Sequence, residues 1–138
     1  MRALSIRQPW VELILRGDKQ VEYRTWKTNH LGDLLIHASA THNKDVRANI
    51  EEQGLEAAQL VFGAVVGVVE VTRYSVVQPQ RSLLDRVRGL FSGRLEEPEE
   101  TVYEWHLANP RRFETPIPYK GAAGIFLVPD EALGDRSL

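Results

Sequence analysis

The sequence contains no cysteine. This absence excludes disulfide bonds, thiolate nucleophiles and thiolate metal ligands. No apolar run approaches the roughly 20 residues that a membrane-spanning helix requires. Residues 1–15 do not resemble a signal peptide, because Arg2, Arg7 and Glu12 interrupt the apolar positions. We therefore expect a soluble, cytoplasmic protein, with residues 1–138 forming a single domain that is long enough to bury a core.

The sequence also lacks the usual patterns of metal and hydrolase sites. Its four histidines have no metal-ligand spacing; they are His30, His37, His42 and His106. No nucleophile-elbow motif surrounds any serine and no glycine-rich loop could hold a phosphate, although a Ser/His/Asp set formed by folding stays open. We expect no metal and no cofactor. His37 follows Ile36 in an apolar strand, and we expect it to be a hydrogen-bonded structural residue beside a cleft.

The charge is close to balanced, with a formal net charge of −2. Proteins that bind nucleic acid by bulk electrostatics usually carry a clear basic excess, so that class is disfavoured. The distribution is uneven, however, because residues 1–47 hold eight Lys or Arg against five acidic residues, whereas residues 96–104 are acidic. The basic N-terminal part permits contact with a few phosphates.

Residues 4–24 combine a strand, a helix and a second strand. We predict a first strand at 2–6 and a helix at 9–16, which starts at Pro9 and ends before Gly17. Trp10, Leu13 and Ile14 recur at helical spacing, so we expect Trp10 to lie mainly in the core. After Gly17 the period changes to two, which predicts a strand at residues 20–25.

The strand at 20–25 carries the candidate site. Alternation places Glu22 and Arg24 on one face, and Lys19 at the strand's entrance can reach the same side. A solvated strand face with alternating charges is the simpler interpretation. Against it, tryptophans flank the group on both sides, and we expect Trp26 to be partly exposed at the cleft.

The rest of the chain alternates between short predicted strands and loops. We expect a strand at 34–38, a helix capped by Asn43 or Thr41 and ended by Gly54, and a central strand at 63–72 bent at its glycines. In that strand we place Glu70 on the face of Val66 and Val68, with solvent favoured over the cleft. Residues 78–101 form a variable insertion with a short helical apolar pattern. A strand at 103–107 is expected to break at 109–110, followed by a closing strand at 124–128 and a frayed tail from residue 130.

Several of these stretches resemble one known family. The N-terminal motifs SIRQPW, LILRGDKQVEYRTW and GDLLIHAS, followed by EWHLANPRRF, PIPYKG and GIFLV, are similar in order and kind to the ASCH domain, a member of the PUA-like superfamily. The resemblance covers most of the chain outside residues 78–101. It implies an α+β fold, a small PUA-like β-barrel with flanking helices.

The resemblance and the charged strand together favour a nucleic-acid-binding module. Aromatic rings would stack on an unpaired or modified base, while Lys19 and Arg24 neutralise phosphate and Glu22 accepts hydrogen bonds from a base edge. RNA or single-stranded nucleic acid, or a nucleoside or nucleotide, is the expected partner. The candidate ligand-binding residues are Arg7, Gln8, Lys19, Glu22, Arg24, Trp26 and Ser39.

A small hydrolase is the alternative. Some ASCH proteins are similar to acetylcytidine amidohydrolases, in which the motif lysine acts as a base and a threonine three residues later is the nucleophile. Lys19 matches that lysine, but Glu22 occupies the threonine position. If the chain is an enzyme, Lys19 and Glu22 would be catalytic, with the carboxylate activating water. A scaffold or interaction domain comes third, because it would leave the framed charged group unexplained.

Overall fold

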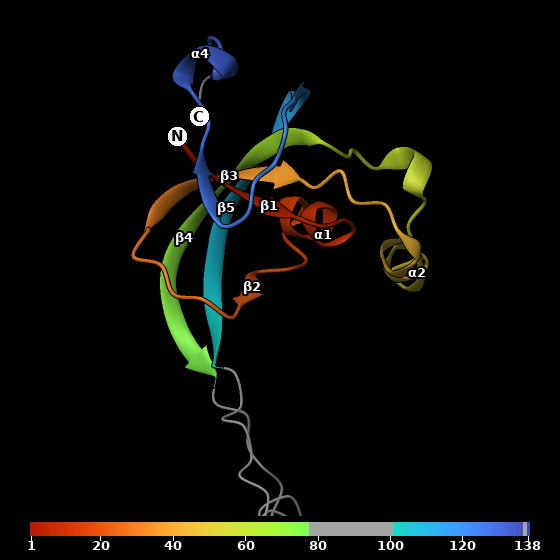
Figure 1. Cartoon of the computed structure of the whole chain (residues 1–138), viewed down its shortest axis with the longest axis horizontal. Helices are drawn as coiled ribbons and strands as arrows, with labels where there is room; N and C mark the ends of the chain where they lie inside the picture. Colours follow the sequence, from red (N-terminus) through yellow and green to blue (C-terminus); the bar gives the residue numbers. More distant parts are fainter. Residues whose placement is uncertain (78–100, 137) are drawn as a thin grey trace, which may run out of the picture.

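The computed structural model describes residues 1–77, 101–136 and 138, which form a mixed α+β fold (Figure 1). Three α-helices in this part of the chain and one short 3-10 helix accompany six strands. In chain order the elements are β1 (Arg2–Ile6), α1 (Trp10–Arg16), β2 (Val21–Arg24), β3 (Gly32–Ala38), α2 (Lys44–Glu52), η1 (Ala57–Gln59), β4 (Ala64–Val77), β5 (Val102–Pro118), β6 (Ile125–Leu127) and α4 (Asp130–Leu133). The helical pattern that we predict within the insertion falls on residues 78–100, outside the described residues.

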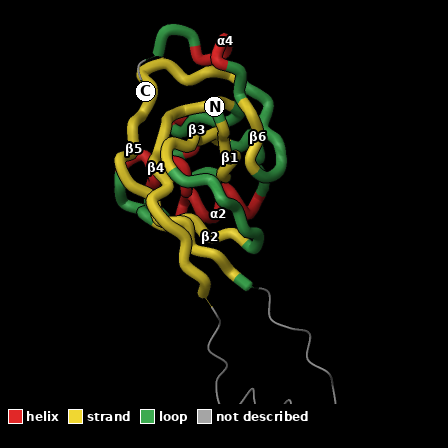
Figure 2. Tube along the Cα trace, turned by 90° about the vertical axis from the view of Figure 1, so that its left-hand side faces the viewer, coloured by secondary structure: helices red, strands yellow, loops and turns green. Residues whose placement is uncertain are grey.

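The six strands form one sheet in the order β2-β5-β4-β3-β1-β6. β1 pairs with β3 in parallel, and the other neighbours are antiparallel. β4 and β5 are long and run side by side beyond the body of the fold (Figure 2). Among the described strands, β2 and β6 end the sheet and do not pair with each other, so the expected closed barrel is not confirmed.

Irregularities in the β4–β5 pairing correct two sequence predictions. The register shifts between Val65 and Gly67 and again between Val68 and Glu70, so Val66 packs in one core cluster and Val68 in the other, contrary to the expected shared face. The expected break at residues 109–110 is also wrong, because β5 continues through them. These two residues lie in a bulge, in which Asn109 adopts a φ of 51°.

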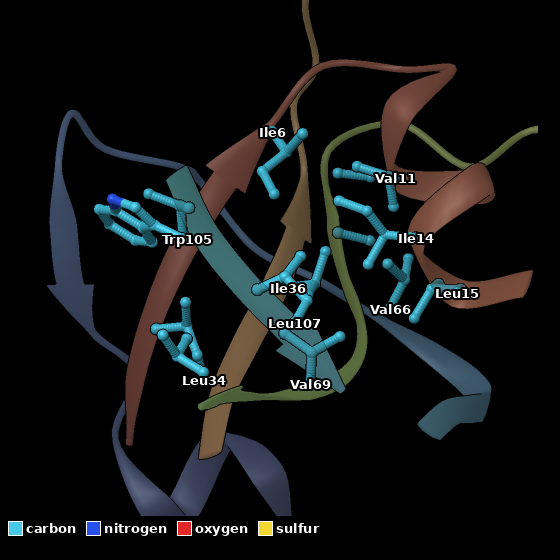
Figure 3. Packing of buried hydrophobic residues seen from close by; sticks show 14 residues of the cluster. Ile6, Val11, Ile14, Leu15, Leu34, Ile36, Val66, Val69, Trp105 and Leu107 are labelled. Atoms are coloured by element: carbon cyan, nitrogen blue, oxygen red, sulfur yellow. The ribbon is translucent and has the colours of Figure 1, made fainter. Parts of the chain in front are cut away.

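Two clusters of buried apolar side chains cover the two faces of the sheet. On one face, Val11, Ile14 and Leu15 of α1 pack against Val66 and its strand neighbours (Figure 3). The opposite face is covered partly by Leu133 of α4, so the expectation of a frayed tail is wrong for residues 130–133. β3 runs between these clusters, and residues 34–38 are all buried.

The helix boundaries follow the expected local chemistry. Gly17 ends α1 with a φ of 83°, and its N–H donates to the Ile14 carbonyl. Asn43 Oδ1 accepts a hydrogen bond from the Val46 N–H at 3.0 Å and so caps α2. In the part of the chain that the structure describes, no helix has the length and apolar character needed to cross a membrane.

Gly67 brings β5 and α1 close to β4. A Cβ atom at this position would contact the Arg111 carbonyl oxygen and lie 2.8 Å from Leu15 Cδ2. The backbone contact cannot be relieved by rotating a side chain. We therefore expect Gly67→Ala to lower the free energy of unfolding by about 2 kcal/mol or more, measured by urea denaturation.

Val76→Ala, in the same strand, is the control for this prediction. Val76 is 56% exposed, so its truncation should cost less than about 1 kcal/mol. Equal stability of Gly67→Ala and the wild type would contradict the close approach.

Candidate functional site

A hollow of about 840 Å³ lies where the end of β1, strand β2, the end of β3 and the loop before β6 meet. Its walls combine aromatic rings with charged and polar groups. The aromatic residues are Trp10, Tyr23 and Tyr119, and the charged and polar ones include Arg7, Glu22, Arg24, His37, Ser39 and Lys120. The volume is in the range of small-molecule sites. We call this hollow the β1–β2 cavity.

Glu22 is the buried charged residue of this cavity. It is 9% exposed, and its pairing partner on β5 is Trp105. Its Oε1 lies 3.5 Å from Arg24 Nε, whereas Oε2 is buried and finds no hydrogen-bond donor among the described residues. Arg24 Nε and Trp105 Nε1 are likewise buried without an acceptor in this part of the chain. Glu22 and Arg24, which both line the cavity, thus keep unused hydrogen-bonding capacity, which is costly unless a ligand uses it.

Burial raises the pKa of Glu22 above its ordinary value of 4.5, against the opposing charges of Arg24 and Lys19. Carboxylates whose pKa is shifted by burial inside a cavity are found at many functional sites.

Arg24 and Lys19 reach this region from opposite ends of β2. Arg24 Nη2 donates to the Ser5 carbonyl at 3.1 Å, which fixes the guanidinium between β2 and β1. Lys19 does not line the cavity itself. Its ammonium lies 5.9 Å from the ring centre of Trp10 and 5.1 Å from that of Tyr23, two residues that line the cavity. The lysine charge is therefore held beside two aromatic residues of the cavity wall.

Arg7 and Ser39 line the cavity, whereas Gln8 does not. Ser39 Oγ donates to Thr41 Oγ1 and accepts from the Thr41 N–H. Gln8 is 2% exposed: its Nε2 donates to the Val61 carbonyl and its Oε1 accepts from the Glu12 N–H in the first turn of α1. The ligand-binding role expected for Gln8 is thus corrected to a structural one, because both of its polar atoms are used within the protein.

Trp10 and Trp26 are both half-buried and pack against the same core cluster, but their relation to the cavity differs from the expectation. Trp10 lines the cavity, whereas Trp26 is absent from its walls and packs edge-on against Trp105, with ring centres 5.0 Å apart. β2 ends at Arg24, so the turn that follows it directs the Trp26 ring onto the core. Helical periodicity identifies the side of α1 that carries Trp10, but it cannot reveal that the outer end of this ring borders a hollow.

His37 has the structural role expected from the sequence. It is 1% exposed, and its Nε2 lies 2.6 Å from the Tyr119 carbonyl oxygen. A carbonyl can only accept, so Nε2 carries a proton; in the neutral ring Nδ1 then accepts from Ser5 Oγ, 2.9 Å away. Gly121 packs against this pair, because a Cβ there would lie 2.7 Å from His37 Cε1.

Sequence reasoning missed the loop that closes the cavity. Tyr119, Lys120 and Gly121 contribute to its walls, yet they are more than 80 residues from His37 in the chain. The motif PIPYKG contains these residues, but nothing in it indicates which strand the loop would face. The described residues contain no cluster of three or more His, Cys, Asp or Glu that could hold a metal ion.

The model of the ASCH domain matches residues 4–117. The chain belongs to the ASCH domain family. A crystal structure of ASCH from Zymomonas mobilis superposes with a TM-score of 0.56 at 14% identity, covering 96% of this chain and 90% of that one. A crystal structure of a mutant of the same Zymomonas mobilis protein gives 0.55 at 14% identity, covering 96% and 92%. At this identity the likeness concerns the fold.

Two curated proteins resemble a short part of this ASCH domain. Activating signal cointegrator 1 of Homo sapiens is 54% identical over 37 residues, which are 27% of this chain and 6% of that protein. The Mus musculus protein of the same name is 53% identical over 36 residues, 26% of this chain and 6% of that protein. The matched stretch is thus a small part of both relatives.

The raised pKa of Glu22 has a consequence for stability. The unfolded chain loses this proton near pH 4.5 and the folded chain loses it only at higher pH, so stability falls as pH rises between the two values. Glu22→Gln, which cannot ionise, should therefore be more stable than the wild type at pH 7.5, with the difference closing below pH 4.5. Urea unfolding at both pH values measures this.

Glu12→Gln is a control of opposite sign. Burial raises the pKa of Glu12, but hydrogen bonds and charges from Arg112 and Arg16 outweigh it, so the net pKa is lowered. The stability that ionised Glu12 provides is present above pH 4.5 and is lost as pH falls through the folded pKa. Glu12→Gln should thus be less stable than the wild type at pH 7.5. If Glu22→Gln is destabilised in the same way, the assignment of Glu22 as a desolvated carboxylate is wrong.

Proposed function

We propose that this ASCH domain binds RNA or single-stranded nucleic acid by holding one unpaired or modified base in the β1–β2 cavity. The observation that carries the proposal is the combination of aromatic walls, cations and a buried carboxylate in one hollow of about 840 Å³. Trp10 and Tyr23 would supply stacking surfaces for the base, with stacking worth about 1–3 kcal/mol. A free nucleoside or nucleotide would use the same contacts.

The cations around the cavity suit a short stretch of phosphate backbone. Arg7, Arg24 and Lys120 line the hollow, and Lys19 lies beside its aromatic residues. The chain as a whole has a net charge of −2, so binding would depend on this local group and not on bulk attraction. Affinity for a short single strand should therefore fall with salt, with a slope that reflects a few phosphates.

Lys19→Ala tests the electrostatic part of the proposal. Loss of one phosphate contact should weaken binding of a short single-stranded RNA and reduce the slope of log affinity against log salt concentration by roughly 0.7–1. Fluorescence anisotropy with labelled RNA over a salt series measures both quantities.

Lys44→Ala is the matched control, because Lys44 is exposed at the start of α2 and does not line the cavity. It should leave affinity and slope near their wild-type values. Identical behaviour of Lys19→Ala and Lys44→Ala would contradict a phosphate contact at Lys19.

A second candidate, hydrolysis of an N-acylated cytidine, is favoured by one observation. The pKa of Glu22 is raised by burial inside the cavity, with Lys19 close enough to oppose the shift. A carboxyl group whose pKa lies nearer neutrality is better suited to general acid–base catalysis. In this reaction a water molecule would attack the acyl carbonyl while Glu22 takes a proton from that water. The C–N bond would then break, and a proton would pass to the released amine.

Turnover separates the two candidates. Incubation of the protein with N4-acetylcytidine, followed by chromatography, should release cytidine and acetate if the chain is a hydrolase. Glu22→Gln should then abolish turnover and keep the fold. Binding of RNA by the wild type without turnover of the nucleoside would support the binding module and reject the hydrolase.

A further inference from the structure

The unused acceptor of Glu22 indicates which base edge the cavity can hold. Glu22 lines the hollow, yet its Oε2 is buried with no donor among the described residues, and its Oε1 lies 3.5 Å from Arg24 Nε. Both oxygens of an ionised carboxylate accept hydrogen bonds and neither can donate. The terminal torsion of a glutamate is soft, so small rotations can aim both oxygens at one ligand edge.

Several other polar groups nearby are engaged within the protein. Ser5 Oγ and both ring nitrogens of His37 belong to the hydrogen-bond chain that ends at the Tyr119 carbonyl. Ser39 Oγ is hydrogen-bonded to Thr41. The charged side chains at the cavity other than Glu22 are cations, which suit phosphate. Among the described residues that line the cavity, Glu22 is therefore the acidic side chain that can accept hydrogen bonds from a base.

We infer that the β1–β2 cavity selects an unpaired guanine, whose N1–H and N2–H groups donate to the two carboxylate oxygens of Glu22. This inference rests on the proposed function. The Watson–Crick edge of guanine presents two adjacent donors, which match the two acceptors of a carboxylate. Splayed-out bases of single-stranded RNA are commonly read on this edge.

The other bases fit this acceptor pair less well. Adenine and cytosine place an acceptor nitrogen beside their amino group, so one carboxylate oxygen would face a lone pair. Uracil has a single N–H between two carbonyl oxygens, and the carboxylate would repel these oxygens. A hydrogen bond to a charged group is worth about 1.5–3 kcal/mol, and leaving one unmade corresponds to a loss of tenfold or more in affinity.

The experiment compares short RNAs of equal length that differ at one central position in a uridine background. Anisotropy titrations at constant salt should give guanosine about tenfold tighter binding than adenosine, cytidine or uridine. Inosine, which lacks the N2 amino group, should bind with intermediate affinity. 7-Deazaguanosine, which keeps the Watson–Crick edge and changes the opposite one, should bind like guanosine.

Variants of the protein separate base reading from phosphate binding. Glu22→Gln replaces one acceptor by a donor, so it should remove the preference for guanosine and leave the affinity for the other RNAs within a few fold. Arg7→Ala should weaken all RNAs by a similar factor and keep the preference. Circular dichroism confirms that each variant is folded.

The outcomes distinguish the inference from the proposed function. Equal binding of all four bases, or a guanosine preference that survives in Glu22→Gln, overturns the inference while the proposed function stands. Failure of every RNA to bind overturns both. A preference for cytidine or adenosine also overturns the inference, because it would require a protonated Glu22 that donates a hydrogen bond to the acceptor nitrogen of the base.

Discussion

The close approach of three elements at Gly67 is the constraint on which the rest of the structure depends. The missing side chain at this position lets β5 pass close to β4 and lets Leu15 of α1 lie against the same point. α1 is thereby held on the sheet, and its first residue, Trp10, reaches the edge of the cavity. The turn after Gly17 then leads into β2, which pairs with β5 and brings Glu22 opposite Trp105. Packing at one glycine is thus connected to the placement of the charged site.

The burial of Glu22 carries a structural cost. A carboxylate that is 9% exposed loses most of its hydration, and the 3.5 Å contact with Arg24 replaces only part of it. Glu12, by contrast, accepts two hydrogen bonds from Arg112 at 2.9 Å. A folded protein keeps such an unsatisfied group most readily where a ligand completes its hydrogen bonds. This contrast between two glutamates of the same protein supports a binding role for Glu22.

Local chemistry predicted the elements better than their connections. The first strand and both N-terminal helices follow from Pro9, Gly17 and the Asn43 cap, which act on their own neighbours in the chain. The faces of β4 and the continuity of β5 did not follow, because two-residue alternation assumes a regular ladder and the bulges reset it. The same reasoning recovered the proximity of Glu22 and Arg24, which lie two residues apart on one short strand. It failed for Gln8 and Trp26, whose surroundings come from distant segments.

The sequence by itself determined the family, the mixed α+β class and the charged strand, because each follows from short local motifs and from their order along the chain. The tertiary structure decided which side chains share the cavity. Tyr119 and Lys120 join Glu22 there, although about a hundred residues separate them. It also decided that Trp10 borders the hollow and that Trp26 packs on Trp105. Those outcomes depend on strand order and on register shifts between segments far apart in sequence, and the energy of such long-range packing leaves no local signature.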